Sequence, residues 1–199
     1  MTPSSMITKS GCVRPFHGKI AVAFELNRVD DKIVHVIEFI RNHLFNSTNY
    51  SFDDGATDVI NVPYPNPEHY EHNIFNYTEI KTYEEIQANM DSFHFTAEPP
   101  ADPTVSDALQ YIGHRRNTMN DSAALIVVGL RKPDDQTFDY YWLEHLRAEQ
   151  NYKVLSVAVA YPGYANLTWL ADKPEWSFHV DSTNGQHVAD EISEIVCQF

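Results

Sequence analysis

Cysteine is scarce in this chain of 199 residues: only Cys12 and Cys197 occur, and they bracket nearly the whole sequence. No stretch approaches the roughly 20 apolar residues of a membrane-spanning helix, which argues against an integral membrane protein. Basic residues are also few, with 14 Lys and Arg against 28 Asp and Glu and a formal net charge of -14. Phosphate backbones and anionic lipids repel such a chain, so nucleic-acid and membrane-surface roles are disfavoured.

Familiar catalytic motifs are missing as well. The sequence contains no G-x-S-x-G nucleophile elbow, no P-loop and no G-x-G-x-x-G dinucleotide fingerprint. His69 and His72, with Glu68 and Glu71 beside them, suggest a zinc site. Their spacing differs from H-E-x-x-H, however, and the surrounding prolines argue against the helix that such a site needs. We interpret them as histidines of a surface loop.

The amino-terminal residues do not reveal the cellular compartment. Residues 1–11 (MTPSSMITKSG) are polar and lack the apolar segment of a signal peptide. This is compatible with a cytosolic protein or with a mature secreted domain that follows an added Met. We expect residues 1–11 to be a leader or residues added to the natural sequence. Residues 12–199 should form a single domain, since that length suits one sheet covered by helices.

Glycosylation acceptor motifs favour secretion. Asn-x-Ser/Thr occurs more often than the asparagine content would give by chance, and most of the motifs lie where we expect a loop or turn. The acceptors are Asn46, Asn49, Asn76, Asn120 and Asn166. We therefore predict a secreted glycoprotein, with accidental motifs on a cytosolic protein as the alternative.

Buried strands alternate with amphipathic helices along the chain. Strands are predicted where apolar runs are short and continuous, and helices where apolar residues recur at helical spacing. The predicted strands are residues 19–24, 123–128 and 154–160, and the predicted helices are 33–44, 105–112, 138–150 and 188–196. This order predicts an α/β fold with a doubly wound, mostly parallel sheet and helices on both faces.

The intervening segments are less regular. Residues 58–62 and 74–78 read as short strands. Between them Pro63, Pro65 and Pro67 interrupt pairing, so we expect an edge position or an extended loop. Shorter elements complete the pattern: helices at 83–90 and 166–171, and an edge strand at 177–180. On the first helix, His35 and His43 are expected to face solvent.

Three segments resemble the von Willebrand factor type A family. Residues 19–44 resemble its first strand, site turn and first helix, and residues 104–129 the helix and strand that lead to its second site loop. Residues 152–181 match its strand, L-x-x-L-A helix and edge strand ending in Asp, here Asp181. The resemblance spans residues 12–197 and implies an extracellular adhesion or recognition module. It also implies that a Cys12–Cys197 disulfide is reasonable, with two buried thiols as the alternative.

Members of that family bind Mg²⁺ or Mn²⁺ through oxygen ligands at the carboxyl ends of the central strands. The Asp-x-Ser-x-Ser motif falls here on Glu25, Asn27 and Val29, and Thr104 can stand for the family's Thr. The final Asp position falls on Leu130, with Asp134 and Asp135 further on. Because Val29 and Leu130 offer no oxygen ligand, we predict a degenerate site, no required cofactor and metal-independent binding.

The same pole of the domain should carry the binding surface. Tyr and Arg are favoured at interface hot spots, and open parallel sheets place ligands at their carboxyl edge. The candidate binding residues are Arg28, Arg131, Lys132, Tyr161 and Tyr164. We expect the partner to be an extracellular protein or glycan. The two tyrosines could instead merely cover the loop backbone.

Two other functions remain open. A doubly wound enzyme would use carboxylates in a pocket at the carboxyl edge, and the candidates are Glu25, Asp53, Asp54, Asp134 and Asp135. A purely structural spacer in a larger mosaic protein is the other alternative. Since no nucleophile and base can be named, we expect a binding module and no enzyme.

Overall fold

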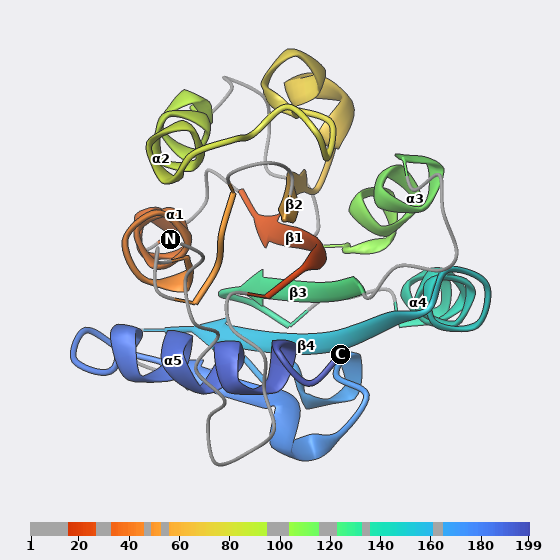
Figure 1. Ribbon diagram of the computed structural model, residues 1–199. Helices are drawn as coiled ribbons and strands as arrows, with labels where there is room; N and C mark the ends of the chain where they lie inside the picture. Colours follow the sequence, from red (N-terminus) through yellow and green to blue (C-terminus); the bar gives the residue numbers. More distant parts are fainter. Residues whose placement is uncertain are drawn as a thin grey trace.

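A computed structural model describes residues 16–26, 33–45, 49–52, 56–94, 104–115, 123–132, 136–160 and 165–199. Its centre is a five-stranded, all-parallel sheet with strand order β2-β1-β3-β4-β5 (Figure 1). The strands are β1 (Gly18–Glu25), β2 (Thr57–Tyr64), β3 (Ala123–Gly129), β4 (Tyr152–Val159) and β5 (Ser177–Val180). Every side chain of β3 is buried, as expected for a strand covered on both faces. The predicted α/β fold is confirmed.

Helices cover both faces of this sheet (Figure 1). On one side lie α1 (Val34–Phe39), its π-helical continuation η2 (Ile40–Leu44), α2 (Tyr83–Ser92) and α5 (Gly185–Val196), with α5 packed against η2 and β5. On the other side α3 (Ser106–Arg115) packs against α4 (Gln136–Gln150). In the described ranges every helix is too short or too polar to cross a lipid bilayer.

Local sequence explains where several helices begin and which face they bury. A capping box starts α2: the Thr82 hydroxyl accepts from the Glu85 backbone N–H, and the Glu85 carboxylate accepts from that of Thr82. On α5 the stripe of Val188, Ile192 and Val196 lies against the core, as its helical spacing predicts. The predicted 166–171 helix is shorter than expected, a 3-10 turn η5 (Thr168–Leu170).

Three local predictions were wrong. Residues 74–78 form no strand but lead into a turn, because the Glu79 carboxylate captures the Asn76 backbone N–H that a strand ladder would need. His69 and His72 lie on a 3-10 helix, η4 (Pro67–Asn73), instead of in a loop, because a helix tolerates proline at its first position. Both histidines are exposed, as expected. His43 is half-buried instead of solvent-facing, because the end of η2 packs against α5.

The chain order reverses at the middle of the sheet. From β1 the chain passes to β2 on one side, whereas β3 pairs with the other side of β1. Such a switch point leaves a crevice at the carboxyl ends of the two diverging strands, where open α/β sheets hold their ligands. The short apolar strands thus place Glu25, the last residue of β1, beside the end of β3.

Candidate functional site

Three strand ends meet at the switch point. In register, Glu25 lies beside Tyr64 at the end of β2, and Phe24 pairs with Val128 near the end of β3. The residues that follow β3 are Leu130 and Arg131. The topology therefore brings together two segments more than 100 positions apart in the sequence.

Glu25 is fully buried and its carboxylate accepts three hydrogen bonds. Its Oε2 accepts from the backbone N–H of Leu130 at 2.8 Å and of Arg131 at 2.9 Å. Its Oε1 lies 2.6 Å from Nε of Arg131, in an ion pair with a guanidinium that is 32% exposed. A buried carboxylate is costly unless it is paired and hydrogen-bonded, and both conditions are met here.

Tyr64 closes the site from the β2 side. Its hydroxyl donates to the Val128 carbonyl at 3.2 Å. Burial raises the pKa of Tyr64 well above its ordinary value; the Glu25 and Asp139 carboxylates raise it further, whereas Arg131 lowers it. The phenol is therefore neutral and remains a hydrogen-bond donor.

Gly129 makes this packing feasible because a Cβ at that position would overlap with the Tyr64 hydroxyl. The same Cβ would lie 3.6 Å from Oε2 of Glu25. A glycine at the end of β3 is thus required by the close approach of its neighbours, and not by an unusual backbone angle.

A second buried carboxylate, Asp139, lies in the first turn of α4. Its Oδ1 accepts from the backbone N–H of Val105 at 3.1 Å and so joins α4 to the start of α3. Sequence reasoning missed this residue. The available signal was its position on the same helical face as the buried Leu143 and Leu146, where a charged side chain has to find a partner.

Among the described residues, the switch point offers few free oxygen ligands for a divalent cation. A Mg²⁺ site needs free carboxylate lone pairs, whereas N–H groups occupy both oxygens of Glu25 and one of them belongs to a permanent cation. Leu130 supplies only a backbone N–H at this point, and the Thr104 hydroxyl lies 3.1 Å from that of Ser106. No group of three or more His, Cys, Asp or Glu that could hold a metal occurs among the described residues.

The structure places only part of the predicted site. It joins Glu25 to Leu130 and Arg131, and it leaves Lys132 exposed beside them. The predicted site residues outside the described ranges are Asn27, Arg28, Val29, Tyr161 and Tyr164, together with Asp53, Asp54, Asp134, Asp135, Cys12, Asn46 and Asn120. Of the described glycosylation candidates, Asn76 and Asn166 are exposed and Asn49 is buried.

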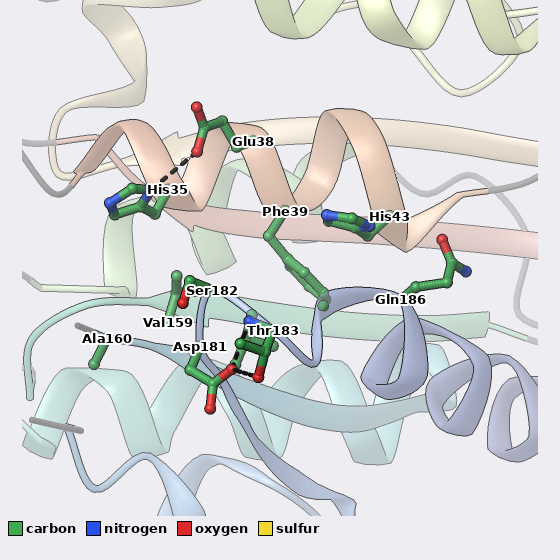
Figure 2. Close-up of a pocket in the computed structure, with 12 residues that line it drawn as sticks. His35, Glu38, Phe39, His43, Val159, Ala160, Asp181, Ser182, Thr183 and Gln186 are labelled. Carbon is green, nitrogen blue, oxygen red and sulfur yellow. Dashed lines mark hydrogen bonds and ion pairs between the residues drawn. The ribbon is translucent and has the colours of Figure 1, made fainter. Parts of the chain in front are cut away.

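A separate cavity of about 480 Å³ opens where β4 and β5 end. Figure 2 shows His35, Glu38, Phe39 and His43 on one side of it, facing Asp181 and its neighbours at the start of α5. Gly185 lets α5 approach the His43 ring, since a Cβ there would lie 2.9 Å from His43 Cδ2.

The carboxylates of this cavity have existing partners. The pKa of Asp181 lies below its ordinary value because the Thr183 hydroxyl and backbone N–H donate to its carboxylate. Glu38 lies 2.9 Å from Nδ1 of His35. A general acid at neutral pH needs the opposite, a raised pKa, so Asp181 is poorly suited to that role.

Comparison with known proteins identifies relatives at two levels. No protein-family model matches the sequence. The chain is 34% identical over 168 residues to "Uncharacterized protein C18H9.6" of Caenorhabditis elegans. The alignment covers 82% of this chain and 95% of the nematode protein. Identity at this level over nearly the whole relative establishes common membership of one family.

Solved structures share the fold at low sequence identity. Proximal thread matrix protein 1 from the mussel byssus, solved with a zinc-occupied MIDAS motif, aligns with a TM-score of 0.71, 13% identity and 92% coverage of this chain. The alignment spans 46% of the mussel protein. BatB from Bacteroides thetaiotaomicron aligns at 0.59 with 10% identity, over 92% of this chain and 100% of that one.

A von Willebrand factor type A protein from Catenulispora acidiphila aligns at a TM-score of 0.57 with 9% identity, over 94% of this chain and 43% of that one. These similarities each cover more than nine-tenths of this chain and confirm the resemblance inferred from sequence. The chain belongs to the same family as the nematode protein C18H9.6, and its fold is that of a von Willebrand factor type A domain.

Proposed function

We propose that this domain is an extracellular recognition module that binds a protein or glycan without a divalent cation. The observation that carries the proposal is the ion pair of Glu25 with Arg131 at the switch point. In a metal-dependent site a cation compensates the carboxylates, and a partner's acidic group completes its shell. Here the chain supplies the compensating positive charge itself, so the site needs no ion to be electrostatically complete.

The charge left over at this edge favours an acidic or hydrogen-bond-accepting partner. Arg131 is one-third exposed while it pairs with Glu25, and Lys132 beside it is exposed. Since the Arg131 charge is compensated by Glu25, the exposed Lys132 supplies the positive charge that orients a partner at this edge.

A pull-down from extracellular fluid with the secreted domain tests this function. We expect the captured partner to be retained equally in EDTA and in Mg²⁺. Lys132→Glu should weaken capture by at least about tenfold, because it reverses a charge at the binding edge without removing buried packing. Lys153→Glu is the matched control, since Lys153 is exposed at the opposite end of the sheet, at the start of β4. Release by EDTA, or equal capture by both variants, would refute the proposal.

Secretion predicts covalent marks on the natural protein. We propose glycans at the exposed Asn76 and Asn166, and a disulfide between Cys12 and Cys197, the residue that caps α5. On the chain-entropy model, closing so long a loop stabilises the fold by about 5 kcal/mol. Mass spectrometry of secreted material should find both glycans and no alkylatable thiol before reduction. Two alkylatable thiols and unmodified asparagines would instead indicate a reducing compartment.

A further inference from the structure

The outward face of α4 carries an unusual share of the exposed aromatic surface. Phe138 is 62% exposed, Tyr141 is 64% exposed and Tyr140 is 44% exposed. In the described part of the chain the other exposed large hydrophobic residues are Val34 and Phe75, which lie on other elements. Exposed apolar residues are ordinary when scattered, but clustering on one helix marks an interaction site.

Ring contacts hold Tyr140 and Tyr141 in two neighbouring groups on α4. The ring centroids of Tyr140 and Trp169 are 5.0 Å apart, and those of Tyr141 and Trp142 are 5.5 Å apart. Trp142 also contacts His145 edge-on, with centroids 5.4 Å apart. Because a helix packed on the sheet holds these rings in place, little side-chain entropy is lost when a partner covers them.

Acidic groups border the rings. A shallow hollow on α4 is lined by Tyr140, Tyr141, Glu144, His145, Ala148 and Glu149. Glu144 and Glu149 are both exposed. The nearby cation Arg147 pairs with both Asp172 and Glu144, and His145 lies 3.3 Å from Glu149. The aromatic face therefore has a negative rim with little unpaired positive charge.

The aromatic rings and their acidic border together indicate which kind of partner can bind the outward face of α4. A second copy of the chain would bring the two acidic rims together and add the repulsion of two domains of net charge -14. An anionic segment meets the same repulsion. A guanidinium or ammonium group, by contrast, can lie over a tyrosine or tryptophan ring and pair with a rim carboxylate at the same time.

We propose that α4 binds an arginine- or lysine-rich segment of a partner protein. The surface (Phe138, Tyr140, Tyr141, Glu144 and Glu149) lies on the helix and is distinct from the Glu25–Arg131 site, so it does not depend on the metal-independent function proposed above. The domain would then carry two recognition surfaces of opposite charge preference, one at the carboxyl edge of the sheet and one on the α3–α4 side (Figure 1).

A titration with two short acetylated peptides tests the proposal, one alternating arginine with serine and the other alternating glutamate with serine. In amide NMR spectra we expect the arginine peptide to shift α4 resonances saturably, and the glutamate peptide to leave them unchanged. Tyr141→Ser should weaken binding at least about tenfold, since it removes a central ring. Glu144→Gln with Glu149→Gln should weaken it about threefold or more and reduce its salt dependence.

Phe75→Ser is the matched control, because it removes another exposed aromatic ring while leaving α4 intact and should bind like wild type. This control distinguishes binding of the arginine peptide to α4 from a general attraction between a cationic peptide and an acidic protein. Equal affinity of Tyr141→Ser and wild type would overturn the proposal. So would a concentration-dependent dimer that Tyr141→Ser abolishes and the arginine peptide does not compete with, since α4 would then bind a second copy.

Discussion

Glu25→Gln is expected to lower the free energy of unfolding by about 2–3 kcal/mol, measured by urea denaturation. The amide can keep one oxygen for the backbone N–H groups of Leu130 and Arg131, but its NH₂ then faces another donor, the Arg131 guanidinium. The arginine loses its counter-charge while its Nε remains in a tightly packed site. Breaking a fully buried pair costs about 3–5 kcal/mol, and we reduce that figure because Arg131 is partly exposed.

Glu38→Gln provides the control for this measurement. Glu38 also pairs with a potential cation, His35, at 2.9 Å, but both side chains are about half exposed. Exposed pairs contribute little, so we expect a change within about 0.5 kcal/mol. Equal effects of the two substitutions would mean that the Glu25 pair is no more important to the fold than a surface contact.

Gly129→Ala is expected to destabilise the domain by about 2–3 kcal/mol, since the new methyl group would overlap with the hydroxyl of a fully buried tyrosine, Tyr64. Removing that hydroxyl should relieve the overlap. Tyr64→Phe alone should cost about 1 kcal/mol for its hydrogen bond to the Val128 carbonyl. The double variant should therefore lose less unfolding free energy than the two single variants together, by about 1 kcal/mol or more.

Gly113→Ala is the matched substitution for this cycle. Gly113 is also buried, but it lies inside α3 and the nearest atoms to an added Cβ are 3.6 Å away, at ordinary contact distance. Because alanine favours the helix, this variant should be more stable than wild type by about 0.5–1 kcal/mol. Additive energies for Gly129→Ala and Tyr64→Phe would contradict the packing described at the switch point.

The sheet was predictable because its strands are short, continuous apolar runs separated by helices of clear periodicity. Residues 123–128 and 154–160 have no polar face, and this pattern is typical of strands covered on both sides. The error at residues 74–78 has a local cause, since a single glutamate that captures a backbone N–H is invisible to a propensity argument.

The candidate site was only half predictable. Sequence reasoning placed Glu25 and Arg131 at the same edge of the sheet, but in separate roles, as a remnant metal ligand and as a partner-binding residue. Their pairing depends on side-chain reach across β1 and β3, which topology alone does not fix. The burial of Asp139 against α3 likewise depends on how two helices pack, and no spacing rule gives that contact.

Calorimetric titration of the folded domain with Mg²⁺ and with Mn²⁺ tests the central claim most directly. If the Arg131 guanidinium satisfies Glu25, neither ion should give saturable heat of binding up to about millimolar concentration. Lys132→Glu should behave identically, because its side chain is not part of the ion pair. Binding of either ion tighter than about millimolar, lost in Glu25→Gln, would show that a cation displaces the guanidinium and would contradict a metal-independent site.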